Sequence, residues 1–213
     1  MDNVESNVLK TGTTTVGIVC KDGIILAADR RATAGTLIAS KKTEKVHAIA
    51  DNIAVTMAGT ASDAQMLIKL VKSELALNRI RLDREVSVKE AANLLSRMVY
   101  YNIRRMSLIP GISHFLMGGK DTDGFHLYDI FADGSIQLID DFIGSGSGSV
   151  MAYGVMETLY KPDMTSDEGL KLALKCINAA IQRDAASGNG LDVVLVNKDG
   201  VKKIFEKDLT VTV

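Results

Sequence analysis

Cysteine and histidine are scarce in this sequence, and neither is arranged for chemistry. Cys20 and Cys176 each lie inside an apolar segment, so we expect two small buried side chains and no disulfide. The histidines are His47, His114 and His126, which are scattered without the spacing of metal ligands. We therefore predict no metal and no other cofactor.

A surplus of charge and a long apolar run are also missing. The 25 basic and 26 acidic side chains give a net charge of −1, which does not favour nucleic acid or an anionic membrane as a partner. No stretch reaches the roughly 20 apolar residues that a membrane span needs. Residues 1–10 lack the apolar centre of a secretory signal. We expect a cytoplasmic protein.

The remaining composition suits one globular domain without a linker: 213 residues, of which 46% are hydrophobic and 24% charged. Residues 1–12 are polar and lack periodicity, so we interpret them as a tail. A β-branched run at 14–20, the turn Lys21-Asp22-Gly23 and an apolar run at 24–28 predict a hairpin. Further strands are predicted at 53–58, 115–117, 125–130, 135–139, 193–196 and 201–205.

Three helices are predicted from capping-box spacing, in which Ser or Thr is followed three residues later by Glu or Gln. The pairs are Ser62 with Gln65, Ser87 with Glu90, and Thr165 with Glu168. Apolar stripes follow each start, at Leu67, Leu70, Val71 and Leu77, at Ala91, Leu94, Leu95, Met98 and Val99, and at Leu170, Leu174, Ile177 and Ile181. Because antiparallel strands alternate with helix pairs, we predict an α+β fold with two sheets packed between outer helices.

The main candidate for chemistry is the segment Gly12-Thr13-Thr14-Thr15-Val16-Gly17. Its plain interpretation is that three threonines open a β-strand. A cut after Gly12 would instead leave Thr13 with a hydroxyl and a free α-amine. That amine, with a pKa of about 7.7–8.0, can serve as the base that a weak hydroxyl nucleophile needs.

Five further segments have plain interpretations when each is taken alone. Ala28-Asp29-Arg30-Arg31 and Thr43-Glu44-Lys45-Val46 are typical of exposed charged turns. Ala58-Gly59 is typical of a strand that ends in a turn, although a glycine N–H can also point at an oxyanion. The run from 144 to 149 is a flexible loop or a phosphate cradle, but it lacks the third Gly or Ala of a dinucleotide fingerprint. The run from 182 to 188 is typical of a helix end with its glycine cap.

In their joint order these segments resemble the β subunits of proteasomes, most of all the archaeal type. The likeness is carried by Gly12-Thr13-Thr14-Thr15-Val16-Gly17, Ala28-Asp29-Arg30-Arg31, Lys45, Ala58-Gly59, Asp63-Ala64-Gln65, Gly118-Gly119, Gly146-Ser147-Gly148-Ser149, Tyr153-Gly154-Val155 and Arg183-Asp184 with Ser187-Gly188. It spans the chain from Gly12 to the last hairpin. The resemblance implies the four-layer αββα sandwich of N-terminal-nucleophile hydrolases.

The resemblance also implies a threonine endopeptidase. Thr13 matches the nucleophile, which is exposed by self-cleavage after Gly12, so residues 1–12 would be a propeptide and 13–213 the catalytic domain. Asp29 matches the acidic partner of the active-site lysine, Lys45. A lysine ammonium favours an ionised threonine oxygen, and the aspartate keeps the lysine charged.

Other matches concern support and substrate binding. The supporting network around the threonine amine is matched by Ser147, Asp184 and Ser187. The amide that binds the oxyanion is matched by Gly59, and Thr33 matches a residue that pairs with the substrate backbone. The pocket that holds the substrate residue before the cleaved bond is matched by Ala32, Thr43, His47, Met57 and Ala61. Since this pocket is largely apolar, we predict chymotrypsin-like cleavage after bulky apolar residues.

The family's assembly implies the partners: α subunits, other β subunits in seven-membered rings, protein substrates and an activating ATPase ring. The chain departs from the archaeal pattern near residues 107–113, which bears on contacts to neighbouring subunits. Three alternatives stay open. They are a non-catalytic ring subunit of the same fold, a small-molecule amidohydrolase that need not form rings, and a nucleotide-binding module built on the Gly-Ser loop.

Overall fold

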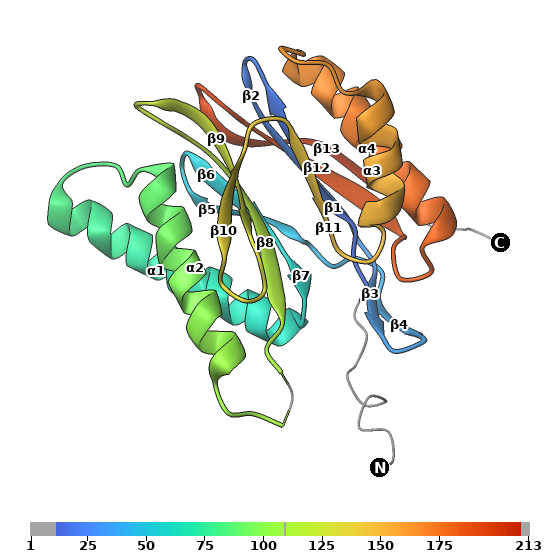
Figure 1. Ribbon diagram of the computed structural model, residues 1–213, viewed down its shortest axis with the longest axis horizontal. Coiled ribbons are helices and arrows are strands. Elements are labelled where there is room, and N and C mark those ends of the chain that lie inside the picture. The colour runs from blue at the N-terminus through green and yellow to red at the C-terminus, as the bar shows by residue number, and fades with distance from the viewer. Residues whose placement is uncertain (1–11, 109, 210–213) are drawn as a thin grey trace.

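Two β-sheets lie face to face in the middle of the molecule, each covered by a pair of helices (Figure 1). The computed structural model describes residues 12–108 and 110–209. The helices there are α1 (Ala61–Leu82), α2 (Val88–Arg104), α3 (Ser149–Leu159) and α4 (Ser166–Arg183). The predicted αββα sandwich is confirmed. Of the predicted tail, residues 1–11 lie outside the described residues.

The first sheet contains the end of the segment Gly12-Thr13-Thr14-Thr15-Val16-Gly17. Its antiparallel strand order is β11 (Phe142–Ser145), β1 (Thr15–Cys20), β2 (Gly23–Asp29), β12 (Gly190–Asn197) and β13 (Gly200–Asp208). The predicted turn at Lys21-Asp22-Gly23 is confirmed, because it joins β1 to β2, and a second Lys-Asp-Gly turn at Lys198-Asp199-Gly200 joins β12 to β13. Every residue of β2 is buried, since this strand is covered on both faces.

The second sheet has the order β10 (Ile136–Ile139), β9 (Gly124–Ile130), β8 (Ser113–Asp121), β6 (Ile53–Thr56) and β5 (Val46–Ala50). The short β7 (Ala58–Gly59) pairs with the beginning of β8, and β3 (Ala32–Ala34) pairs with β4 (Leu37–Ser40) in a separate hairpin. The sequence did not predict β3, β4, β5 or β11. These strands are three to five residues long, too short for a clear period of two.

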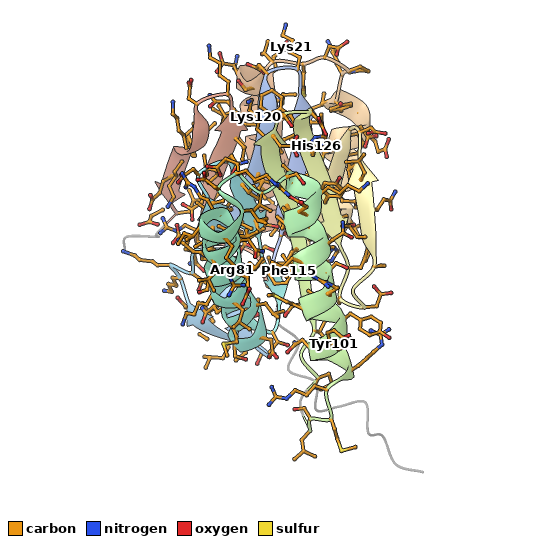
Figure 2. The ribbon with its side chains drawn as sticks, turned by 90° about the vertical axis from the view of Figure 1, so that its left-hand side faces the viewer. Lys21, Arg81, Tyr101, Phe115, Lys120 and His126 are labelled. Carbon is orange, nitrogen blue, oxygen red and sulfur yellow. The ribbon has the colours of Figure 1, made fainter. Side chains whose placement is uncertain are left out.

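Three apolar layers hold the sandwich together. One lies between the second sheet and α1 and α2, one between the first sheet and α3 and α4, and one between the two sheets. Alternation along β8 shows how one strand serves two layers: Phe115 faces the helices and Leu116 faces the other sheet. In Figure 2, Phe115 lies between α1 and α2.

Two of the three predicted helix starts are confirmed, with complete capping boxes at Ser87–Glu90 and Thr165–Glu168. The third is wrong. Helix α1 begins at Ala61 with Thr60 as its N-cap and no side-chain cap bond. The Thr60 N–H is 2.7 Å from the carbonyl oxygen of Ile112. That backbone bond fixes where the chain enters α1, so Ser62 lies inside the first turn of the helix.

The predicted apolar stripe of α1 is only partly buried. Leu67 and Val71 are in the core, but Leu70 and Leu77 are each 43% exposed. The stripes of α2 and α4 are buried or half-buried as predicted. Among the described helices none is both long and apolar enough to cross a membrane.

Candidate active site

Thr13 lies two residues before the start of β1 and is 6% exposed. Its hydroxyl donates to the carbonyl oxygen of Gly12 at 2.7 Å, and its backbone N–H is 3.3 Å from Ser147 Oγ. The Gly12–Thr13 peptide bond is intact here, so the Thr13 nitrogen is an amide. The hydroxyl thus lies next to the carbonyl group of the residue before it.

Gly12 occupies a place where no side chain fits. A Cβ on this residue would lie 1.7 Å from Ala186 Cβ, so any other residue would force a shift. The Gly12 N–H donates to Thr33 Oγ1 at 3.0 Å. Glycine directly before Thr13 is therefore required by the packing of the loop after α4.

The end of β2 brings Asp29 against Lys45, which directly precedes β5. Asp29 Oδ1 accepts from Lys45 Nζ at 2.7 Å and from the Thr14 N–H at 2.9 Å. Its Oδ2 accepts from the backbone N–H groups of Arg31 and Gly188 at 3.0 and 2.9 Å. Four donors hold one buried carboxylate, which is how a buried charge is tolerated. Burial lowers the pKa of Lys45 from its usual value, and the Asp29 carboxylate opposes this effect.

A second polar network lies on the other side of Thr13. Asp184, the residue that ends α4, accepts at Oδ2 from both Ser147 Oγ and Ser187 Oγ at 2.6 Å. Ser187 Oγ is also 2.7 Å from Thr14 Oγ1. The predicted trio of Ser147, Asp184 and Ser187 is thus brought together beside the nitrogen of Thr13.

The glycines of the Gly-Ser loop allow its close approach to the threonines. Gly146 has φ +87°, and a Cβ there would lie 2.1 Å from the Thr13 carbonyl oxygen. A Cβ on Gly148 would lie 2.0 Å from Thr14 Oγ1. The loop therefore packs directly on the candidate nucleophile, a role that the flexible-loop interpretation does not include.

The cavity beside Thr13 contains most of the residues matched to substrate binding. It is lined by Gly12, Thr13, Ala32, Thr33, Thr43, Lys45, Met57, Ala58, Gly59, Ala61 and Ala64. His47 is not among them. It lies on β5, close enough to Glu44 and to Lys72 of α1 for both to affect its pKa, which burial lowers. Gly59 has φ +105°, and a Cβ on it would lie 2.2 Å from the Ile112 carbonyl oxygen, so its N–H is placed by a conformation that favours glycine.

Two residues that support the site, Thr14 and Arg31, were not predicted from the sequence. Thr14 binds both Asp29 and Ser187, which links the two networks. Arg31 donates from Nε to Asn189 Oδ1 at 2.8 Å and from Nη1 to the Ala185 carbonyl at 2.7 Å, which clamps the loop after α4. Both residues belong to the motifs, but only tertiary contacts reveal these partners.

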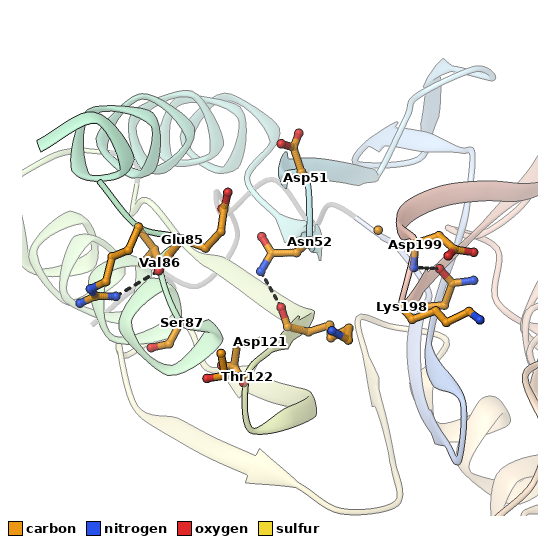
Figure 3. Close-up of a pocket in the computed structure, with 13 residues that line it drawn as sticks. Asp51, Asn52, Glu85, Val86, Ser87, Asp121, Thr122, Lys198 and Asp199 are labelled. Atoms are coloured by element: carbon orange, nitrogen blue, oxygen red, sulfur yellow. Dashed lines mark hydrogen bonds between the residues drawn. The ribbon is translucent and has the colours of Figure 1, made fainter. Parts of the chain in front are cut away.

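A second, more open groove lies at the far end of the sheets, around Asn52, Lys120 and Lys198 (Figure 3). Lys120 is at the end of β8 opposite Ser113, which pairs with Gly59. None of the residues around Thr13 lines this groove, and its walls carry charges of both signs. Within residues 12–108 and 110–209, no group of three or more His, Cys, Asp or Glu side chains is arranged to hold a metal.

Most of the chain is similar in sequence to known proteins of one family. A family described as "Proteasome subunit" matches residues 9–196. A "Proteasome subunit beta" of Methanocorpusculum labreanum is 48% identical over 191 residues, which are 90% of this chain and 88% of the relative. That of Methanosphaerula palustris is 45% identical over 205 residues, covering 96% and 95% of the two chains. That of Archaeoglobus profundus is 41% identical over 210 residues, covering 98% and 95%.

Proposed function

This chain belongs to the proteasome family as a β-type threonine-protease subunit, and we propose that Thr13 becomes its nucleophile when the Gly12–Thr13 bond is cut. One observation carries the proposal: Thr13 lines one cavity with Lys45, which binds Asp29, and the Thr13 N–H is 3.3 Å from the Ser147 Oγ that binds Asp184.

Self-cleavage would begin with attack of Thr13 Oγ1 on the Gly12 carbonyl carbon. The C–N bond breaks as an ester forms between Gly12 and the threonine oxygen, and the hydroxyl proton passes to the departing nitrogen. Water then hydrolyses the ester, which releases residues 1–12 and leaves Thr13 with a free amine. The 2.7 Å contact between the hydroxyl and the Gly12 carbonyl oxygen supports this first step.

Peptide hydrolysis would repeat the same chemistry on a substrate. The α-amine takes the proton from the hydroxyl, directly or through one water, and later gives it to the leaving amine. Lys45 stabilises the developing charge on the threonine oxygen, and the Gly59 N–H receives the oxyanion. Ser147 and Asp184 hold and polarise the amine, since Ser147 Oγ already accepts from the Thr13 N–H in the uncleaved chain and is itself bound to Asp184.

The first experiment is intact mass after assembly with α subunits of the same organism. We expect the parent to lose residues 1–12 and to cleave peptides, whereas Thr13→Ala keeps them and is inactive. Thr15→Val is the matched control, because Thr15 Oγ1 is buried without a hydrogen-bond partner among the described residues. If assembled parent keeps its tail, the non-catalytic ring subunit becomes the better description.

The cleavage preference follows from the cavity walls. Ala32, Met57, Ala61 and Ala64 give it a largely apolar lining, made of three small side chains and the flexible side chain of Met57. We propose cleavage after bulky apolar residues. Fluorogenic peptides that differ only in the residue before the cut test this, and faster cleavage after acidic or basic residues would contradict it.

Assembly into rings is proposed from family membership and from exposed apolar side chains. Along α1, Leu70, Leu77 and Ile80 are exposed in the single chain, as contact surfaces for neighbouring subunits would be. We propose α subunits, other β subunits and an activating ATPase ring as partners, in the cytoplasm. Native mass of the particle separates this arrangement from the alternative of a small amidohydrolase.

A further inference from the structure

Three polar side chains form a chain between the two sheets, near the candidate active site. Ser145 Oγ is 2.7 Å from His114 Nδ1, and His114 Nε2 is 2.5 Å from Asp129 Oδ1. Ser145 is 2% exposed and Asp129 is fully buried. These residues come from β11, β8 and β9, so the chain of contacts crosses from the first sheet to the second.

The order Ser–His–Asp is that of a hydrolytic triad, but its surroundings exclude that use. The serine oxygen is buried and lies within a paired strand. None of the three residues lines the cavity beside Thr13. The ring of Phe131 stacks on the imidazole with 4.8 Å between ring centres. A substrate carbonyl therefore has no route to Ser145, and the contacts must serve another purpose.

The bridge joins the two strand pairs that hold the candidate catalytic groups. On the first sheet, Ser145 pairs with Thr15, and the next residues, Gly146 and Ser147, contact Thr13. On the second sheet, His114 pairs with Ala58, directly beside Gly59. The nucleophile and the amide proposed for the oxyanion thus belong to different sheets, and a hydrogen-bonded bridge spans the gap between those sheets.

We propose that Ser145, His114 and Asp129 are positioning residues that fix the separation between the Thr13 hydroxyl and the Gly59 N–H. This inference rests on the proposed function, since it matters only if those two groups act on one carbonyl. A carboxylate only accepts hydrogen bonds, so Asp129 selects the imidazole form with a proton on Nε2. Nδ1 is then left to accept from the Ser145 hydroxyl, which orients β11 relative to β8.

The test uses Ser145→Ala in the particle assembled with α subunits. This change cuts the bridge and leaves the His114–Asp129 pair intact, so no buried charge loses its partner. Ser113→Ala is the matched control, because Ser113 is a neighbouring buried serine whose Oγ has no partner among the described residues. His114→Gln is the conservative variant, since its amide can accept from Ser145 and donate to Asp129.

We expect kcat per titrated Thr13 to fall about 10- to 100-fold in Ser145→Ala, as a displaced catalytic group would cause. KM should stay within about threefold, because the substrate cavity is untouched. Ser113→Ala should match the parent, and His114→Gln should stay within about threefold of it. A purely structural role would lower the yield of assembled particle in Ser145→Ala and leave kcat per site unchanged.

Three outcomes would overturn the inference. One is an unchanged kcat in Ser145→Ala, and another is an equal loss in Ser113→Ala. The third is labelling of Ser145 by a fluorophosphonate in the Thr13→Ala particle, which would indicate a second hydrolytic site. Full activity in Thr13→Ala would overturn the proposed function as well, whereas a Thr13-dependent parent with a normal Ser145→Ala would reject the bridge alone.

Discussion

Lys45 Nζ lies 2.7 Å from Asp29 Oδ1, and the two side chains are 3% and 0% exposed. Such a pair costs desolvation energy that its own attraction barely offsets. Backbone N–H groups of three residues also bind the Asp29 carboxylate. The fold therefore supplies donors that still bind the Asp29 side chain when Lys45 is replaced, so the lysine can be tested by substitution.

Lys45→Met should remove catalysis while sparing most of the fold. We expect kcat to fall about 1,000-fold or more, because the charge that stabilises the threonine oxygen is lost. Asp29 keeps its backbone donors, so the variant should still fold and assemble. Peptide hydrolysis and particle mass check this. Thr33→Val, expected to cost less, is the comparison, and equal losses in the two variants would contradict the assignment of Lys45.

Gly12→Ala should slow removal of the tail. The added Cβ would lie 1.7 Å from Ala186 Cβ, so the Gly12 carbonyl must move away from the Thr13 hydroxyl. We expect processing to be at least about tenfold slower. Intact mass, measured at successive times after assembly, gives the rate of processing. Combining Gly12→Ala with Ala186→Gly should restore part of the rate. An unchanged rate of processing in Gly12→Ala would contradict the prediction, because it would show that the loop after α4 moves to make room for the methyl group.

Gly169→Ala should destabilise the subunit although it replaces a glycine inside a helix. A Cβ at this place on α4 would lie 2.5 Å from Cys20 Sγ, and overpacking of this kind costs about 1–3 kcal/mol. That loss outweighs the roughly 0.5–1 kcal/mol that alanine gains in a helix. Gly154→Ala on α3 is the control, since no atom lies within 4 Å of its Cβ, and it should stabilise. Urea unfolding measures both, and equal stability would refute the packing argument.

The two thiols should be unreactive in the folded protein. Burial raises the pKa of Cys20 and of Cys176 to about 12, so almost no thiolate exists at pH 8. We expect iodoacetamide to leave both unlabelled in native protein and to label both in urea, by intact mass. Rapid labelling of either one without denaturant would mean that its layer between sheet and helices opens readily.

Much of the architecture followed from local patterns. The hairpin turns at Lys21-Asp22-Gly23 and Lys198-Asp199-Gly200 and the capping boxes at Ser87 and Thr165 are set by neighbours within three residues. The start of α1 was misplaced because a long-range bond from Thr60 to Ile112 decides it. Leu70 and Leu77 were predicted to be buried because periodicity locates an apolar face but does not say what covers it.

In the candidate site, too, some features follow from local sequence and others from long-range contacts. The order of motifs around Thr13, Asp29 and Lys45 was sufficient, through resemblance, to nominate the nucleophile and its ion pair. Only the tertiary structure brought Asp184 to Ser147, put Ala186 against Gly12, left His47 outside the cavity and joined His114 to Ser145. Local patterns predicted the helices, the longer strands and the residue types of the chemistry, because these depend on short-range preference, but they missed the short strands β3, β4, β5 and β11. These tertiary contacts join residues 31 to 174 positions apart, and they were decided by the packing of two sheets, which no local pattern encodes.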